Sequence, residues 1–261
     1  MVRISYDLRK RSKSDIYWTG DIMNKNDFAQ MKVSGTEISY SQAHEVQTQY
    51  ALSMIIPTRN EAGNIEPLLT RIDQATRGTA LEVIFVDDST DDTPEVIRSL
   101  QDRFPLRITL IARPPERRKS GLGGAVVEGF KVARAPWVCV MDADLQHPPE
   151  FIPKMLKHAQ KTGSDIVVGS RLAKGGDATS LGLKRTIISQ IFATTTRVTF
   201  PQRLRSVTDP LTGFFILQRA AVNPDDLHPD GFKILLEILV SHPNLTVSEI
   251  PIHFGYRNAG E

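Results

Sequence analysis

Short apolar runs alternate with helix-like segments through most of the chain, and this alternation constrains the fold more than any other feature. The runs are ALSMIIP from Ala51, LEVIFVDD from Leu81, RITLIAR from Arg107, WVCVMDAD from Trp137 and SDIVVGSR from Ser164. Strands that are apolar on both faces and alternate with helices specify a parallel sheet with helices on both sides. We therefore predict an α/β, Rossmann-like, doubly wound and mostly parallel sheet, with its functional loops at the carboxyl ends of the strands.

The length of the chain favours one large domain over two small ones. With 261 residues, of which 40% are hydrophobic, the chain can bury a substantial core. Residues 1–48 lack a sustained helical or strand periodicity, which predicts a poorly ordered N-terminal extension. The folded domain is then expected over 49–261, where TGFFILQ and LTVSEIPIHF read as further strands and GFKILLEILVSHP as a helix.

Charge and cysteine content exclude several classes of protein. The formal net charge is only +2, so no strong basic field indicates a nucleic-acid partner. The single cysteine, Cys139, lies in an apolar strand and is interpreted as a small buried hydrophobe. Neither a secretion signal nor a run of about 18 apolar residues is present. These features predict a soluble or peripheral cytoplasmic protein.

One segment stands out because it lacks acids. Between Asp177 and Asp209 there is no acidic residue, while the cations Lys184, Arg185, Arg197, Arg203 and Arg205 all lie there. Residues 181–205 also place several apolar side chains near one helical face. A core-packing helix and an amphipathic helix in a lipid interface both fit this pattern, and the missing acids favour the second. Replacing Arg197, Arg203 and Arg205 with Glu is expected to weaken binding to anionic vesicles.

Two aspartates separated by one residue carry the strongest chemical signal. Asp142 and Asp144 follow the apolar run that begins at Trp137, so both are expected at a strand tip, with Gln146 just beyond. Carboxylate and amide oxygens suit Mg²⁺ or Mn²⁺, and a diphosphate would complete the shell around the metal. The competing interpretation is that the acids cap the helix that follows Pro148 and Pro149.

Further polar clusters follow the other strands. Pro57, Arg59 and Glu61 come after the first strand, and Asp87 and Asp88 after the second. Acids at such tips can accept hydrogen bonds from ribose hydroxyls or from a base, although Asp-Asp-Ser-Thr also forms an ordinary turn.

A glycine-rich segment, a lone arginine and a later aspartate complete the set. Arg117 to Gly124 combines cations with a flexible backbone at a helix start, which suits a phosphate, yet it matches neither the P-loop nor the G-x-G-x-x-G pattern. Arg171 ends the strand SDIVVGSR, and Asp209 precedes LTGFF. The forked donors of an arginine are suited to gripping phosphate.

Taken in order, these clusters resemble a known family. The segments PTRNE, VDDST, GLGGA, DADLQHPP, GSR, DPLTGFF and GFKILLEIL, spread over about residues 52–257, are similar to the dolichol-phosphate or polyprenyl-phosphate mannosyltransferase branch of the inverting family 2 glycosyltransferases. The resemblance implies a GT-A fold with C-terminal amphipathic interface helices. It also implies a divalent metal, a nucleotide sugar as donor and a lipid monophosphate as acceptor, met at the cytoplasmic face of a membrane. The chain fits the catalytic part of a longer protein that has a C-terminal membrane region.

The resemblance also implies roles for individual residues. Contacts to the nucleotide sugar would come from Pro57, Arg59, Glu61, Asp87, Asp88, Gly124, Asp142, Ala143, Asp144 and Lys233. The metal would be held by Asp142, Asp144 and Gln146, and the acceptor phosphate by Arg171 and Arg257. Asp144, Arg171 and Asp209 would serve catalysis. Because a phosphate monoester has a second pKa near ~6, it is already an anion at neutral pH, and Asp209 need not act as a base.

Several alternatives stay open at this stage. GDP-mannose is favoured as the donor, but UDP-glucose fits the same pattern. A glycosyltransferase that acts on a hydroxyl group would need a working base, and Asp209 is the candidate. A nucleotidyltransferase would be expected to carry a glycine-rich loop where this chain has Pro57 to Glu61. A non-catalytic module that binds sugar nucleotides would bind the donor without turnover.

Overall fold

The computed structural model describes residues 50–177, 207–229 and 233–255, together with 32–33, 36–37, 194–196, 198–200 and residue 204. The chain divides into two compact units, residues 1–46 and 47–261. In the first unit, β1 (Lys32–Val33) pairs antiparallel with β2 (Thr36–Glu37). The expected poor order of residues 1–48 stays a prediction.

The second unit is built on a sheet of seven strands. In chain order these are β3 (Leu52–Thr58), β4 (Leu81–Asp87), β5 (Arg107–Ala112), β6 (Trp137–Val140), β7 (Ile166–Ser170), β8 (Phe215–Gln218) and β9 (Val247–Pro251). Their spatial order is β5-β4-β3-β6-β8-β7-β9. Strand β8 runs antiparallel to β6 and to β7, and the other neighbours are parallel, which confirms the predicted mostly parallel sheet.

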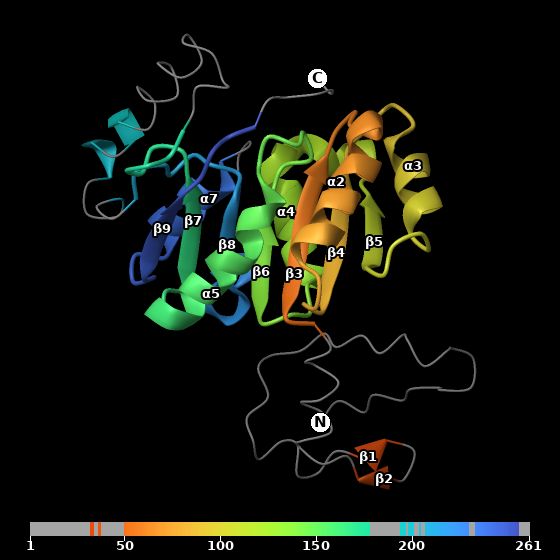
Figure 1. Ribbon diagram of the computed structural model, residues 1–261, viewed down its shortest axis with the longest axis horizontal. Helices are drawn as coiled ribbons and strands as arrows, with labels where there is room; N and C mark the ends of the chain where they lie inside the picture. Colours follow the sequence, from red (N-terminus) through yellow and green to blue (C-terminus); the bar gives the residue numbers. More distant parts are fainter. Residues whose placement is uncertain are drawn as a thin grey trace. The chain divides into compact units, whose positions relative to one another are not determined.

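Helices cover both faces of the sheet (Figure 1). On one face lie α2 (Ala62–Ala75), α3 (Thr93–Leu100) and α5 (Ile152–Thr162), and on the other lie α4 (Gly121–Val132) and α7 (Ile234–Ser241). Short 3-10 turns occupy Pro115–Ser120, Pro149–Phe151, Arg219–Ala221 and Pro224–Asp226. The predicted order of strands and helices is therefore confirmed.

The sheet divides the hydrophobic core into two layers. Successive residues of a strand point to opposite faces, so Met54 and Ile56 pack with α2, α3 and α5, while Ile55 packs with α4 and α7. All seven residues of β3 and of β4 are buried, and Cys139 on β6 is buried as predicted. This double burial explains why these strands are continuous apolar runs in the sequence.

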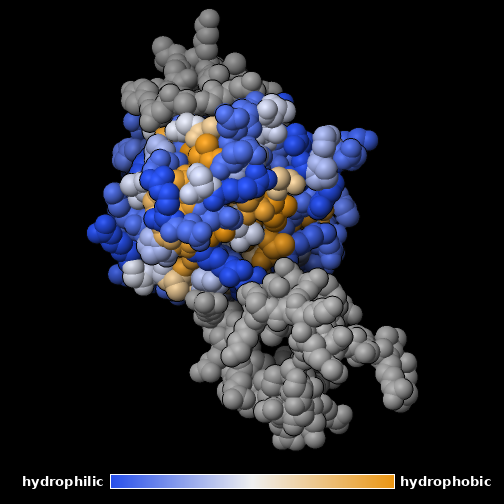
Figure 2. All heavy atoms as spheres, turned by 90° about the vertical axis from the view of Figure 1, so that its right-hand side faces the viewer, coloured by the Kyte–Doolittle hydropathy of each residue, from blue (hydrophilic) through white to orange (hydrophobic). Residues whose placement is uncertain are grey.

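The strand β5 forms one edge of the sheet and is less covered than β3 and β4. Figure 2 looks onto this side of the molecule and shows apolar residues lying between polar ones. Leu110 and Ile111 are partly buried there, and Arg107 at the start of the strand is exposed. A charged residue on an edge strand discourages further strand pairing.

The strand order fixes where a ligand can bind. Strand β3 continues to β4 on one side, and its other neighbour, β6, comes later in the chain. In open α/β sheets, ligands bind beyond the carboxyl ends of the strands at such a switch point. The tips of β3 and β6 carry the segments that begin at Arg59 and Asp142. In the part of the chain described here, no helix is long and apolar enough to cross a membrane.

Candidate active site

The tips of β3 and β4 are joined through a buried aspartate. The side chain of Asp87 is fully buried and accepts hydrogen bonds from Thr58 Oγ1 at 2.7 Å, from Ser89 Oγ at 2.6 Å and from the Ser89 amide at 3.1 Å. These donors satisfy a carboxylate that would otherwise be costly to bury. Asp87 therefore holds the two tips together, and its neighbour Asp88 is the more exposed member of the pair.

Asp88 is held in turn by a buried arginine that the sequence reasoning missed. Arg113 follows β5, is 1% exposed, and donates from Nε to Asp88 Oδ1 at 2.8 Å and from Nη2 to Asp88 Oδ2. The same guanidinium donates to the carbonyl of Arg117 at 3.1 Å and to that of Gly121 at 2.8 Å. Arg113 thus fixes the β4 tip and the glycine-rich segment in one arrangement.

The predicted residue Gly124 lies on α4 at a point of close approach. A Cβ at this position would lie 1.7 Å from Ser120 Oγ and 3.0 Å from Arg113 Nη1. A side chain on Gly124 would therefore collide with Ser120 and crowd Arg113. The glycine lets α4 pack closely against the Ser120 side chain.

The loop after β3 is shaped by an asparagine in the left-handed region. Asn60 has a φ of 57°, and its Oδ1 accepts from the Thr90 amide at 2.9 Å. Next to it, Glu61 is buried, its amide donates to Thr93 Oγ1 at 2.9 Å, and its carboxylate accepts from Asn64 Nδ2. Of the predicted nucleotide contacts in this loop, Arg59 is exposed and Pro57 is buried within β3.

The paired aspartates lie beyond the end of β6, as predicted. Asp142 and Asp144 are half-buried and Ala143 between them is buried. Asp144 Oδ1 accepts from the Gln146 amide at 3.1 Å, while Gln146 Nε2 donates to the carbonyl of Gly255 at 3.3 Å. Gln146 therefore ties this tip to the segment after β9.

The donor chemistry at this tip fits a hard divalent cation. Carboxylate oxygens from Asp142 and Asp144 are the ligands that Mg²⁺ and Mn²⁺ prefer. A Cβ at Gly213 would lie 2.6 Å from both oxygens of Asp142, so the glycine makes room for this carboxylate. No group of three or more His, Cys, Asp or Glu side chains within the described residues is arranged to hold a metal alone. A ligand such as a diphosphate would have to complete the shell.

His147 packs behind Asp142. Its ring stacks on Phe214 at 5.3 Å and meets Phe254 edge-on at 5.1 Å, and its Nδ1 faces the Asp142 amide at 3.4 Å and the Asp142 carboxylate at 3.5 Å. Burial lowers the pKa of His147 to about 4. The carboxylates of Asp144 and Asp209 oppose this shift, and the charge of Arg171 adds to it. A neutral ring whose Nδ1 accepts from the amide carries its proton on Nε2.

Arg171 and Asp209, distant in sequence, form a buried pair. Arg171 donates from Nε to Asp209 Oδ2 at 2.8 Å, from Nη2 to Oδ1 at 2.9 Å, and from its amide to Oδ2 at 3.2 Å. Arg171 follows β7 and Asp209 precedes β8. Because β8 is antiparallel to β7, these two ends meet at the same edge of the sheet.

One cavity gathers predicted residues from the tips of β6 and β7 and from the start of α7. Its volume is about 160 Å³, and Asp142, Arg171 and Lys233 all line it together with His147 and Phe254. Lys233 donates from Nζ to the carbonyl of Leu211 at 3.2 Å, and desolvation lowers its pKa. The cavity therefore combines one carboxylate with two cations, which suits ligands that carry phosphate groups and a metal.

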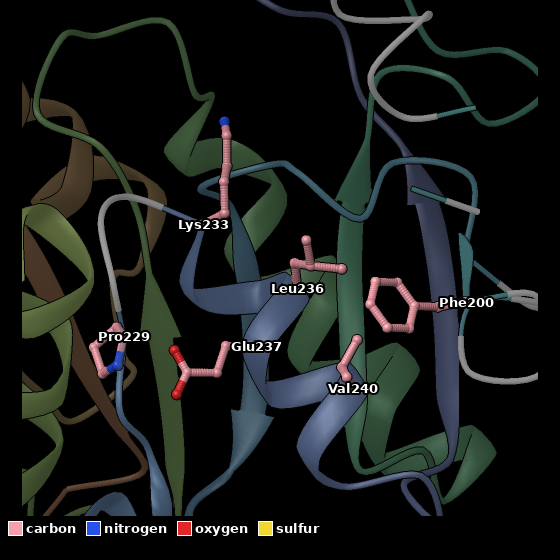
Figure 3. A pocket seen from close by; sticks show the side chains of 6 residues that line it. All are labelled: Phe200, Pro229, Lys233, Leu236, Glu237 and Val240. Carbon is pink, nitrogen blue, oxygen red and sulfur yellow. The ribbon is translucent and has the colours of Figure 1, made fainter. Parts of the chain in front are cut away.

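A second, more apolar cavity of about 260 Å³ lies beside the first, and Lys233 lines both. Its other lining residues are Phe200, Pro229, Leu236, Glu237 and Val240. Figure 3 shows Leu236 and Val240, from α7, pointing toward Phe200, while the carboxylate of Glu237 points toward Pro229. Glu237 also accepts a hydrogen bond from the His228 amide. The Glu237 carboxylate is therefore hydrogen-bonded on one side of the cavity, and the apolar side chains of Phe200, Leu236 and Val240 meet on the other side.

Some predictions fall outside the described residues. Arg257, expected at the acceptor phosphate, lies there, as do Lys184, Arg185, Arg197, Arg203 and Arg205. Within 181–205, residues 194–196 and 198–199 are helical, and the side chains of Val198 and Phe200 are 74% and 36% exposed. The amphipathic interface helix stays a prediction.

Comparison with known proteins identifies the family. The sequence profile of glycosyl transferase family 2 matches residues 53–224. The chain belongs to this family.

The chain is also similar to individual members of known name. It is 44% identical over 211 residues to a dolichol-phosphate mannosyltransferase of Pyrococcus furiosus, a match that covers 80% of this chain and 58% of the relative. It is 36% identical over 224 residues to the Saccharomyces cerevisiae protein of the same name, covering 80% of this chain and 79% of the relative. The chain thus spans less than two thirds of the length of the Pyrococcus furiosus relative.

Solved structures of other proteins agree on the fold. Glucosyl-3-phosphoglycerate synthase from Mycobacterium tuberculosis, in complex with Mn²⁺, uridine diphosphate and glucosyl-3-phosphoglycerate, superposes with a TM-score of 0.59. The match covers 94% of this chain and 80% of that structure at 17% identity. At this identity the likeness concerns the fold alone, and it confirms the predicted GT-A architecture of this family 2 chain.

Proposed function

We propose that this family 2 chain transfers a hexose, with mannose favoured, from a nucleotide sugar to a polyprenyl or dolichyl monophosphate, with inversion at the anomeric carbon. The observation that carries the proposal is the cavity in which Asp142 faces the two cations Arg171 and Lys233. The curated relatives, named dolichol-phosphate mannosyltransferase at 34 to 44% identity, support the choice of sugar and acceptor. GDP-mannose is the favoured donor.

The donor would bind at the tips of β3, β4 and β6. Glu61 and Asp88 offer acceptors for ribose or base, and Arg113 holds Asp88 in place. Asp142 and Asp144 would hold Mg²⁺ or Mn²⁺ against the diphosphate. When bound, such a metal would neutralise negative charge on the departing diphosphate. The Mycobacterium tuberculosis enzyme, which binds Mn²⁺ with uridine diphosphate, is a precedent for this chemistry on the same fold.

The acceptor phosphate would be held by Arg171 and Lys233. A phosphate oxygen of the lipid attacks the anomeric carbon. The bond from that carbon to the nucleoside diphosphate breaks, and its electron pair leaves with the diphosphate. Because the second pKa of a phosphate monoester is near ~6, the nucleophile is already charged at neutral pH and needs no base. The contribution of the protein would then be positioning and charge compensation.

The apolar cavity beside Lys233 is suited to the first isoprene units of the acceptor. Phe200, Leu236 and Val240 offer an apolar wall, and Lys233 belongs to both cavities, so the phosphate and its chain would lie on either side of one lysine. Such a chain enters from a membrane surface. The acid-free segment between Asp177 and Asp209 supports peripheral contact with anionic lipid.

A donor screen tests the proposal directly. The protein is incubated with Mn²⁺, a short polyprenyl phosphate and either GDP-mannose or UDP-glucose, each labelled in the sugar, and the label that becomes lipid-extractable is measured. Transfer from GDP-mannose is expected, and transfer from UDP-glucose would correct the donor. Tight donor binding without transfer to the lipid would refute the acceptor assignment. Transfer to a hydroxyl acceptor instead would favour the base-dependent alternative.

A further inference from the structure

A glutamate outside the cavity organises the loop that carries Asp209. Glu249 lies on β9, opposite Val168 of β7 in the sheet. Its Oε1 accepts from the amides of Thr208 at 2.8 Å and of Asp209 at 3.2 Å, and its Oε2 accepts from Thr208 Oγ1 at 2.8 Å. One carboxylate thus fixes two successive peptide groups and a hydroxyl. Hydrogen bonds to a charged acceptor are about twice as strong as neutral ones.

The same network reaches the backbone on the other side of Arg171. Because the Thr208 hydroxyl donates to Glu249, it must accept from Ser170 Oγ, which lies 2.9 Å away. Ser170 Oγ accepts in turn from the amides of Leu172 at 3.3 Å and of Ala173 at 2.9 Å. The residues that flank Arg171 are therefore connected to β9 through two hydroxyl groups.

The network ends at a guanidinium that faces the cavity. Asp209, held by Glu249 through its amide, binds the Nε and Nη2 edge of Arg171. Nη1 of Arg171 makes no hydrogen bond to the described residues, and Arg171 lines the cavity with Asp142. A displacement of the Asp209 backbone would therefore move the guanidinium with it. A misplacement of about 1 Å in a positioning group can cost about a hundredfold in rate.

We propose that Glu249 is a positioning residue that sets the place of the Arg171 guanidinium against the acceptor phosphate, through Thr208 and Asp209. This inference rests on the proposed function, because it concerns the acceptor side of the same cavity. It assigns Glu249 a role in acceptor binding and none in donor binding. A purely structural role would instead lower the amount of folded protein and affect both substrates alike.

The test separates acceptor from donor. Glu249→Ala is expected to raise the KM for the polyprenyl phosphate by about tenfold or more, with the Kd of the nucleotide sugar in Mn²⁺ unchanged within about twofold. Glu249→Gln keeps one oxygen for the two amides, and its amide group can donate to Thr208 Oγ1, so it should restore most of the acceptor affinity. Thr208→Val removes the hydroxyl link at nearly constant volume and should raise the acceptor KM in the same direction, by less.

A buried glutamate at the opposite end of the sheet provides a matched control. Glu82 is 2% exposed and accepts from Ser53 Oγ at 2.7 Å and from the Arg134 amide at 2.8 Å. Glu82→Ala should lower the midpoint of thermal unfolding without a selective rise in the acceptor KM. An equal selective rise in this variant would show that loss of any hydrogen-bonded carboxylate in the sheet has the effect, and would overturn the proposal.

Arg171→Ala distinguishes the inference from the function on which it rests. If wild-type protein transfers no sugar to the lipid phosphate, the proposed function is wrong. If transfer occurs and Arg171→Ala leaves the acceptor KM unchanged, the role of Arg171 is wrong, and the role of Glu249 falls with it. If Arg171→Ala raises the acceptor KM but Glu249→Ala and Thr208→Val do not, the positioning role alone is overturned.

Discussion

Arg171 donates from Nε and Nη2 to the two carboxylate oxygens of Asp209, at 2.8 and 2.9 Å, and the Asp209 side chain is 1% exposed. This bidentate ion pair limits the chemical role of each of its two residues. Asp209 is occupied by a cation and is poorly placed to remove a proton from a substrate. Arg171 is oriented by the same pair, with Phe254 5.1 Å below its guanidinium. The pair fits an acceptor that arrives already ionised.

Replacing Asp209 with Asn tests this division of roles. The amide retains one acceptor for Arg171 but removes the opposing charge. We expect kcat/KM for the lipid phosphate to fall by about 10- to 100-fold, the range of one charged hydrogen bond, with transfer still above background. Binding of the nucleotide sugar, measured by calorimetry, should stay the same. Complete loss of transfer with intact donor binding would instead identify Asp209 as a base and favour a hydroxyl acceptor.

The strands and their polar tips were predictable because their signals are local. Met54 and Ile56 alternate with Ile55 between two buried faces, and apolar runs of this kind report double burial directly. Asp142 and Asp144 follow such a run, so their position at the edge of the sheet needed only the parallel arrangement of the strands.

The side chains that pair with these polar strand-tip residues were not predictable, because the pairs depend on the order of the strands in the sheet. Arg113 directly follows β5, at the end of a run that reads as an ordinary strand, and only the pairing of β5 with β4 brings it to Asp88. Glu249 is a lone acid in the last strand, and its target becomes visible only when β9 pairs with β7. The signal available in the sequence was a charged residue within an apolar strand or directly after one. This signal does not identify the residue with which the charged group will pair.

Arg113→Lys should weaken both the fold and donor binding. A lysine keeps the charge but has no planar fork to serve both oxygens of Asp88 and two carbonyl groups. Because breaking a buried ion pair costs about 3–5 kcal/mol, we expect the free energy of unfolding to drop by about 2 kcal/mol or more, since part of the pair survives. The Kd of the nucleotide should rise about tenfold. Urea unfolding and calorimetry measure the two effects.

The matched control for Arg113 is Arg98→Lys. Arg98 pairs with Glu95 on the surface of α3, at 2.8 Å, with both side chains more than half exposed. Exposed helix pairs three or four residues apart contribute about 0.2–0.5 kcal/mol, so neither stability nor nucleotide affinity should change measurably. A comparable loss in both variants would mean that burial of Arg113 is not the cause.

Two substitutions at Asn60 separate backbone strain from hydrogen bonding. Its φ of 57° is costly for Ala by about 1–2 kcal/mol, and Oδ1 accepts from Thr90. Asn60→Ala loses both the tolerated conformation and the acceptor, whereas Asn60→Gly loses only the acceptor but has a more flexible unfolded chain. We expect Asn60→Gly to be the milder change, by about 1 kcal/mol in urea unfolding. Both variants lack the acceptor for Thr90, so the reverse order would show that backbone strain at position 60 does not decide the difference and that the loop adopts another conformation.

The pKa of His147 predicts a loss of stability in mild acid for the metal-free protein. Burial lowers this pKa to about 4, whereas the unfolded chain has the ordinary value near 6.5. Between these values the unfolded state binds more protons, so stability falls as the pH drops from about 6.5 to about 4, by at most about 1.4 kcal/mol per pH unit. Urea unfolding in chelator across this range measures the slope. His147→Gln should show a shallower slope, and parallel curves would assign the titration to another group.

Gly213→Ala should remove the metal-dependent part of nucleotide binding. The added Cβ would lie 2.6 Å from both oxygens of Asp142, a distance that real Cβ atoms do not tolerate, and this half-exposed carboxylate can move away. We expect the increase in nucleotide affinity caused by Mn²⁺ to fall about tenfold or more, while affinity in chelator is unchanged. Calorimetric titrations with and without Mn²⁺ give both values.

The double variant shows whether Gly213 acts through Asp142. If the methyl group does no more than displace this carboxylate, Asp142→Ala and the combination of Asp142→Ala with Gly213→Ala should bind the nucleotide in Mn²⁺ with the same affinity. Additive losses would mean that Gly213 supports the ligand by a separate route, such as close approach of its backbone. Thermal unfolding of all three variants in chelator serves as the control, because a change there would indicate damage to the fold and not to the metal site.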